Sequence, residues 1–273
     1  AVMAVGLAGC NDGSNRGAPA TSPAPAGSKT AKRQPVADAQ TLRIAVIPKG
    51  TTHEFWKSVH AGAVKASQEL NVDIVWKGPL KEDDREAQID VVENFISRGV
   101  SGMVLAPLDD TALRAPVASA TSANIPVVII DSDLKSPDYV SFVATDNYKG
   151  GALAAKQMIS LLKGQGRIVV LRYQEGSAST MNREKGFLDA IAKAPGIKVV
   201  SANQYGGATT ETAYKASENM LAPLKSPSGK LNIDGIFCPN ESTTFGMLRA
   251  LQDAKLAGTV RFVGFDSSKK LVE

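Results

Sequence analysis

Across most of the chain, short apolar runs alternate with segments of helical periodicity, and this alternation restricts the fold more than any other feature. The first example is LRIAVIPKGTTHEFWKSVHAGAVKASQEL at 42–70. Residues 42–47 form a nearly continuous apolar run, as expected of a parallel strand covered on both faces. Phe55, Val59 and Leu70, with small residues between them, then recur at helical spacing and predict a helix whose apolar face lies on the sheet. The segment predicts the start of a βαβ unit.

The same plan recurs along the rest of the chain. Further strand-like runs lie at 72–76, 102–108, 126–131, 140–147, 167–173, 197–200, 235–240 and 260–266, and segments of helical periodicity separate most of them. Strands alternating with helices favour parallel sheets with right-handed crossovers. Two such series predict an α/β protein of two similar lobes, with residues 41–144 in the first and 145–273 in the second.

Polar and aromatic residues gather just past the predicted strands, where ligands bind in open parallel sheets. Carboxylate, amide and guanidinium groups are planar and can make paired hydrogen bonds, while aromatic rings cover apolar C–H surfaces. Neutral, hydroxyl-rich ligands need that mixture. The residues at these strand ends are His53, Phe55, Trp56, Asp109, Asp110, Asp131, Ser132, Asp133, Glu175, Arg183, Asn240 and Asp266.

Motifs of the common enzyme classes on such scaffolds are missing. The first loop, PKGTTHEFW, has neither a G-x-G-x-x-G nor a Walker sequence to hold a pyrophosphate. No G-x-S-x-G elbow occurs, and His53 and His60 are the only histidines for a nucleophile's base. Asp109 and Asp110 are better explained as loop residues before a helix N-terminus than as a phospho-acceptor pocket. We therefore expect no enzymatic activity, no cofactor and no metal.

The N-terminal forty residues differ from the rest. Residues 1–10, AVMAVGLAGC, resemble the end of a signal peptide with a lipobox, which predicts lipidation at Cys10 and a chain that lacks the front of its signal peptide. Residues 11–40 are rich in Gly, Pro, Ala, Ser and Thr, and this composition predicts a disordered tether. The predicted lipid is the only anchor, because no other run is apolar enough to span a bilayer.

Charge and cysteine content exclude further classes. The formal net charge is +4, of which the four basic and two acidic residues of 1–40 contribute +2. The remainder is almost neutral, so we expect no nucleic-acid partner and no membrane-binding basic helix. Two cysteines, Cys10 and Cys238, do not indicate a disulfide framework.

Several short motifs together resemble the periplasmic sugar-binding proteins of ABC transporters, nearest in pattern to ribose-binding proteins. They are Phe55-Trp56 after the first strand, PVVIIDSD, ATDNYKGG, the helix with NREKGF, and the endings CPN and VGFD. The resemblance runs from Leu42 to the last residue. It implies two Rossmann-like lobes joined by hinge strands that close around one monosaccharide. It also implies a monomer that serves a membrane permease, in the periplasm or lipid-anchored on the outer face of the cell membrane.

The resemblance assigns roles residue by residue. It places ring-stacking aromatics at Phe55 and Trp56, and hydroxyl ligands at Asp131, Arg183, Asn240 and Asp266. Two further ligand positions depart from the family pattern, which leaves the sugar open. His53 stands where ribose binders commonly have Asn, and Ser132 stands where they have Arg.

Two other expectations follow from the resemblance. The family continues past the VGFD strand and returns to the first lobe, so we expect that lobe to be incomplete at Glu273, with its C-terminal part missing. The alternative function is the effector-binding domain of a sugar-responsive regulator or sensor. A regulator of that kind needs an N-terminal helix-turn-helix, whereas this chain has the lipobox and tether there.

Overall fold

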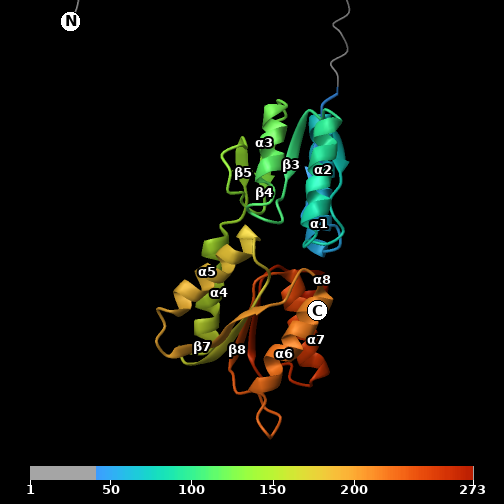
Figure 1. The fold of residues 1–273 in the computed structure, drawn as a ribbon. Helices are drawn as coiled ribbons and strands as arrows, with labels where there is room; N and C mark the ends of the chain where they lie inside the picture. Colours follow the sequence, from blue (N-terminus) through green and yellow to red (C-terminus); the bar gives the residue numbers. More distant parts are fainter. Residues whose placement is uncertain (1–40, 273) are drawn as a thin grey trace, which may run out of the picture. The chain divides into compact units, whose positions relative to one another are not determined.

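Two lobes, each built on a parallel β-sheet, make up the part of the chain that the computed structural model describes, residues 41–272 (Figure 1). All nine predicted strands are present, and helices alternate with most of them. The α/β fold class is therefore confirmed. The predicted lipidation site, Cys10, and the predicted tether, 11–40, lie outside the described residues. No helix within 41–272 is long and apolar enough to cross a membrane.

The first lobe contains a five-stranded sheet with strand order β2-β1-β3-β4-β5, and every pairing is parallel. Helices α2 and α3 cover one face of it, where apolar side chains such as Phe95 and Val117 pack against Met103 and Ile129 of the strands. The elements are β1 (Arg43–Ile47), α1 (Glu54–Leu70), β2 (Asp73–Trp76), α2 (Arg85–Ser97), β3 (Gly102–Leu105), α3 (Arg114–Ser122), β4 (Val127–Ile130) and β5 (Ser141–Val143).

Helix α1 meets the sheet through a different stripe from the predicted one. Trp56 is 2% exposed, and the His60 ring stacks on Trp76 of β2 with a centroid separation of 4.5 Å. Leu70 is 70% exposed, so its prediction as a sheet-facing residue was wrong. The reason is that Phe55 points beyond the strand ends into the site described below. Trp56 is therefore the first residue of the buried face of α1, and that face is shifted by one residue from the predicted one.

The second lobe contains a four-stranded parallel sheet with strand order β7-β6-β8-β9. Helices α4 and α5 pack on one face and α6 and α7 on the other, so that all four residues of β8 are buried. The elements are α4 (Asn147–Leu161), β6 (Gly166–Arg172), α5 (Ala178–Ile191), β7 (Ile197–Tyr205), α6 (Thr210–Leu221), the short 3₁₀-helix η1 (Ala222–Leu224), β8 (Gly235–Cys238), α7 (Glu241–Asp253), β9 (Arg261–Gly264) and α8 (Lys269–Val272).

Two glycines allow α4 and α5 to cross with their backbones in contact. A Cβ atom at Gly151 of α4 would lie only 1.9 Å from the carbonyl oxygen of Arg183, and one at Gly186 of α5 would lie 2.0 Å from that of Tyr148. Real Cβ contacts are never this short, so any side chain would force the two helices apart. The crossing fixes the first turns of α5, which carry residues of the candidate site.

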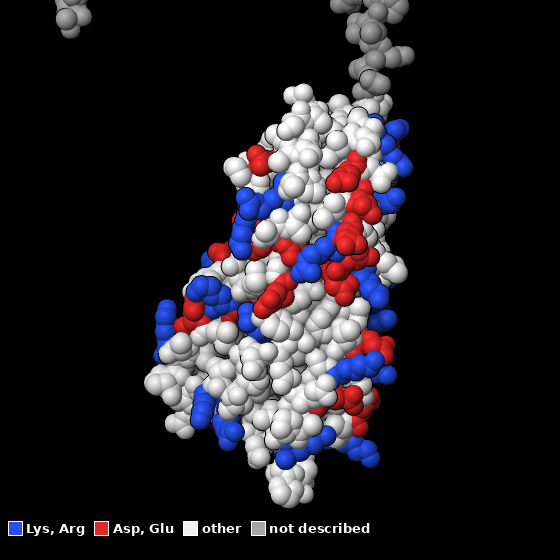
Figure 2. Space-filling model, viewed as in Figure 1, with Lys and Arg blue, Asp and Glu red and all other residues white. Residues whose placement is uncertain are grey.

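The chain passes from the first sheet to the second through residues 144–146, between β5 and α4. Asp146 is the N-cap of α4 and accepts a hydrogen bond from the Lys149 amide at 2.9 Å. This segment contains the predicted boundary between the lobes. Charged side chains of both signs are interspersed over the face shown in Figure 2, which keeps the local field of that face weak.

Candidate functional site

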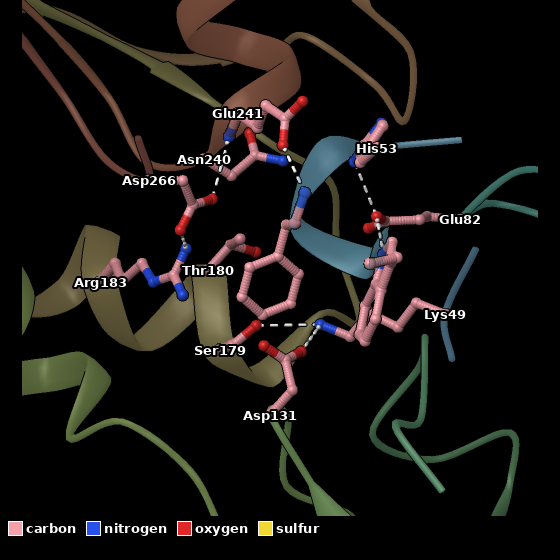
Figure 3. Close-up of a pocket in the computed structure, with 12 residues that line it drawn as sticks. Lys49, His53, Glu82, Asp131, Ser179, Thr180, Arg183, Asn240, Glu241 and Asp266 are labelled. Atoms are coloured by element: carbon pink, nitrogen blue, oxygen red, sulfur yellow. Dashed lines mark hydrogen bonds and ion pairs between the residues drawn. The ribbon is translucent and has the colours of Figure 1, made fainter. Parts of the chain in front are cut away.

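A cavity of about 30 Å³ lies where the carboxyl ends of the two sheets face each other (Figure 3). It is about the size of one water molecule, because the polar groups around it pair with one another. A larger ligand enters only if these pairs separate. The lining residues are Lys49, His53, Phe55, Trp56, Glu82, Asp131, Ser179, Thr180, Arg183, Asn240, Glu241 and Asp266. Seven of the eight predicted ligand residues are among them, and Ser132 is not.

On the first-lobe side, a buried ion pair joins the residues that follow β1 and β4. The Lys49 ammonium lies 2.8 Å from Asp131 Oδ2 and donates to the hydroxyl oxygens of Ser179 at 2.9 Å and Ser177 at 3.3 Å. These three contacts use all three of its donors. Lys49 is 2% exposed, and Asp131 has a left-handed backbone with φ 61°. Lys49 therefore fixes the Asp131 carboxylate and reaches the second lobe at the same time.

On the second-lobe side, Arg183 of α5 is held from four directions. Its Nε donates to Asn147 Oδ1 at 2.8 Å and its Nη1 to the Pro239 carbonyl at 3.0 Å, while Asp266 Oδ1 lies 3.5 Å from Nη1. The Phe265 ring lies under the guanidinium, 3.9 Å from its carbon. Burial raises the pKa of Asp266, and Arg183 offsets only part of this effect. Asp266, like Asp131, has a positive φ, here 66°.

The N-terminus of α7 brings two further residues to the cavity. Asn240 is its N-cap and accepts a hydrogen bond from the Thr243 amide at 3.3 Å. The Glu241 carboxylate accepts from the backbone amides of Glu54 at 3.2 Å and Phe55 at 3.1 Å, which begin α1 in the other lobe. An anion at a helix N-terminus is favourable, so Glu241 caps α1 across the cleft.

Glu82, in the loop between β2 and α2, is the most connected carboxylate of the site. Its Oε1 accepts from Trp56 Nε1 at 2.6 Å and lies 2.8 Å from His53 Nδ1, while its Oε2 accepts from the Tyr173 hydroxyl of the second lobe at 2.7 Å. Burial favours the neutral acid, yet His53, together with Lys49 and Tyr173, outweighs it and lowers the pKa of Glu82 to about 2. Glu82 is therefore ionised at neutral pH.

The remaining predicted residues are aromatic or small. The Phe55 and Trp56 rings meet edge to face with centroids 4.9 Å apart, and Trp56 is almost fully buried. Ser132 is 1% exposed and lies outside the cavity lining, where its hydroxyl oxygen accepts from the Ser179 amide at 3.0 Å. The structure therefore places Ser132 in a contact between the lobes.

Five lining residues were absent from the sequence prediction: Lys49, Glu82, Ser179, Thr180 and Glu241. Lys49 and Glu241 carried a usable signal, since they lie two and three residues past β1 and β8, where other candidates were sought. Glu82 lies six residues past β2, and Ser179 and Thr180 lie in the first turn of α5, so strand-end position alone does not mark them.

Asp109 and Asp110 also follow a strand but lie outside the cavity lining. Asp109 Oδ1 accepts from the amides of Thr111 and Ala112 at 2.9 and 2.8 Å, and its Oδ2 accepts from Arg85 Nε at 2.7 Å. Asp109 thus has the structural role of a loop residue that precedes a helix. Within 41–272, no group of three or more His, Cys, Asp or Glu side chains is arranged to hold a metal ion.

Comparison with known proteins gives a family match over residues 44–273, to the periplasmic binding protein domain. Among curated proteins, the chain is 31% identical over 196 residues to the xylitol-binding protein of Mycolicibacterium smegmatis, covering 72% of this chain. It is 32% identical over 234 residues to the D-ribose/D-allose-binding protein of Pseudomonas aeruginosa, covering 82% of this chain. The chain spans 54% of the length of the first relative and 70% of the second.

A solved structure also resembles this fold. The ABC transporter solute-binding protein from Agrobacterium vitis with bound D-fucose matches with a TM-score of 0.78 and 37% sequence identity. The match covers 84% of this chain and 78% of that protein. The two-lobed arrangement described above is therefore that of the solved binding proteins.

Proposed function

The chain belongs to the periplasmic binding protein domain family, and on this premise we propose that it binds one neutral monosaccharide, or a related polyol, in the cavity between its lobes. The family is one of solute-binding transport proteins, and we infer that this member has no enzymatic activity. The bound sugar is delivered to an ABC permease in the membrane. A binding protein is favoured over a regulator because the relatives reported above are named as binding proteins.

The pairing of buried charges in the cavity carries this proposal. The Lys49 ammonium is paired with Asp131 at 2.8 Å, and the Arg183 guanidinium with Asp266 at 3.5 Å. Of the other two carboxylates, Glu82 lies 2.8 Å from His53 and Glu241 accepts from two backbone amides. Every charge in the cavity therefore already has a partner, and the ligand need not bring a charge of its own. A charged ligand would leave one buried charge unpaired, at a cost of several kcal/mol.

The remaining chemistry suits hydroxyl groups. Carboxylates and a guanidinium make short, paired hydrogen bonds with hydroxyls along the edge of a sugar, and the Phe55 ring supplies an apolar surface for its C–H face. Because Asp131 comes from the first lobe and Arg183 from the second, one ligand bonded to both stabilises the lobes in contact. The xylitol, ribose, allose and fucose in the names of the relatives are all uncharged polyhydroxy compounds of this kind.

We expect isothermal titration of the full chain to show binding of at least one compound among xylitol, D-ribose, D-allose and D-fucose, and none of D-glucosamine or D-gluconate. Phe55→Ala should weaken that binding about tenfold or more, which corresponds to about 1.4 kcal/mol. Leu70→Ala, an exposed position on the same helix, is the matched control and should leave affinity unchanged. Tighter binding of a charged compound, or equal affinity of the Phe55 variant and the parent, contradicts the proposal.

We also propose that the protein acts as a monomer held by a lipid on Cys10, in the periplasm or on the outer face of the cell membrane. The sequence LAGC at 7–10 supports this anchor. Cys10→Ser should move the protein from the membrane fraction to the aqueous fraction after cell lysis and centrifugation. Cys238→Ala, which changes the chain's other cysteine, should fractionate like the parent. If the Cys10 variant stays with the membranes, the anchor lies elsewhere.

A further inference from the structure

His53, in the loop between β1 and α1, has acceptors on both ring nitrogens. Its Nδ1 lies 2.8 Å from the Glu82 carboxylate, as Figure 3 shows, and its Nε2 lies 3.2 Å from the carbonyl oxygen of Ala208. Neither an ionised carboxylate nor a carbonyl oxygen can donate a hydrogen bond. A neutral imidazole has a single N–H and would direct a lone pair at one of these oxygens. The doubly protonated ring donates to both, so the geometry favours the imidazolium.

The two acceptors belong to different lobes. Glu82 lies in the first lobe, whereas Ala208 follows β7 in the second. Glu241 of α7, also in the second lobe, adds a further negative charge near the ring. The groove beside His53 also carries Glu54, Lys81, Glu211 and Lys270. Of the charges that face the ring, the two carboxylates of Glu82 and Glu241 act most strongly, and both favour a positive ring.

Separation of the lobes would change these surroundings on one side only. Glu82 would stay with His53, because both lie in the first lobe, but the Ala208 carbonyl and the Glu241 carboxylate would move away with the second. The Tyr173 hydroxyl, which bonds Glu82 from the second lobe, would leave as well. The ring's second hydrogen bond and part of its electrostatic stabilisation therefore exist only while the lobes are in contact.

We propose that His53 is a positioning residue that fastens the two lobes together as an imidazolium, and that closure of the lobes takes up a proton at this ring. His53 then holds the cavity shut and does not hydrogen-bond the ligand, since its two donors are already used. This role deepens the proposed function, because lobe closure is the step that traps a sugar, but it is tested without any sugar.

The direction of the pH dependence follows from the ring's surroundings. Burial lowers the pKa of His53, but the hydrogen bond and charge of Glu82, the charge of Glu241 and the Ala208 carbonyl outweigh burial and raise it above its ordinary 6.5. A group whose pKa is raised in the closed arrangement stabilises that arrangement fully below its pKa in the open one. The contacts that closure adds to the ring, the Ala208 carbonyl and the Glu241 charge, both favour the protonated form, so their stabilisation of the closed arrangement is lost as pH rises through the raised pKa. Closure should weaken in mildly alkaline solution.

The test measures the distance between the lobes in the full chain with no sugar added. Nitroxide labels are placed on cysteines at two exposed positions, Leu70 of the first lobe and Lys230 of the second, in a Cys10→Ser background. Double electron–electron resonance then gives the distance distribution at about pH 5.5 and about pH 8.5, on either side of a histidine titration. We expect the parent to shift toward longer distances at the higher pH.

Matched variants assign the shift to His53. The chain has two histidines, and His60→Gln removes the one that stacks on Trp76 away from the cavity. It should retain the pH-dependent shift, whereas His53→Gln and Glu82→Gln should abolish it. A parent whose distances do not change with pH overturns the proposal, and so does a His53 variant that shifts as the parent does. Because no sugar is present, a failure here is distinct from a failure of the proposed sugar binding.

Discussion

Replacement of Asp131 by Asn is expected to lower the free energy of unfolding by about 3 kcal/mol, although the two side chains have nearly the same shape. The Lys49 ammonium, 2% exposed and 2.8 Å from Asp131, would lose its only bonded carboxylate among the described residues. An unpaired buried charge is costly, and its two serine partners replace little of the lost interaction. Asn tolerates the left-handed backbone at this position, so the change removes charge without adding strain. Urea denaturation followed by circular dichroism measures the effect.

The control for this prediction is the double variant Lys49→Met, Asp131→Asn. Removing both charges eliminates the unpaired ion, so most of the lost stability should return, while sugar binding should remain weaker than in the parent. This separates the cost of an unpaired charge from the loss of a ligand contact. If Asp131→Asn alone unfolds within about 0.5 kcal/mol of the parent, the ion pair does not stabilise the fold.

Replacement of Gly186 by Ala is expected to cost about 3 kcal/mol, at the upper end of the usual penalty for overpacking. The added methyl would lie 2.0 Å from the Tyr148 carbonyl oxygen, a backbone atom that cannot rotate away. Helices α4 and α5 must then separate, which displaces Arg183 from Asn147 and Pro239 and should weaken ligand binding as well. Thermal unfolding should show a lower midpoint, and titration calorimetry should show lower affinity.

Gly62 of α1 provides the matched control, because a Cβ atom there would meet no heavy atom within 4 Å apart from the adjacent backbone of its own helix. Gly62→Ala should leave binding unchanged and raise stability by about 0.5 to 1 kcal/mol, the usual gain from replacing Gly in a helix interior. The same methyl group thus stabilises one helix and destabilises another. Equal unfolding midpoints for the Gly186 and Gly62 variants would show that α4 and α5 are not in backbone contact.

The positions of the strands along the chain could be predicted because they depend on local pattern. Strands of parallel sheets often appear in a sequence as short apolar runs, and the nine runs stand out against the polar turns around them. The buried face of α1 was misjudged at Leu70 because Phe55 and Trp56 are adjacent aromatics, and periodicity does not tell which of the two belongs to the sheet. The choice depends on the opposite lobe, which accommodates Phe55.

A lining residue of the cavity could be predicted where it lies just past the end of a strand. Asp131 directly follows β4 and Asp266 lies two residues past β9, and both line the cavity. Glu82 was missed because it lies six residues past β2 and one of its partners, the Tyr173 hydroxyl, is far away in the sequence. Strand-end position says nothing about contacts between two lobes. Whether any of these residues binds a sugar remains a prediction for calorimetry.

The positive φ angles of Asp131 and Asp266 limit how this cavity can evolve. A left-handed backbone disfavours most side chains by about 1 to 2 kcal/mol, and Gly, Asn and Asp adopt it most readily. Few substitutions are therefore tolerated at these two positions when a new ligand is selected. Among them, Asp→Asn removes the charge and keeps the shape of the side chain. Descendants of this chain should diversify at Phe55 and Ser179, where the backbone accepts many residues, and retain an acid or amide at the two strand ends.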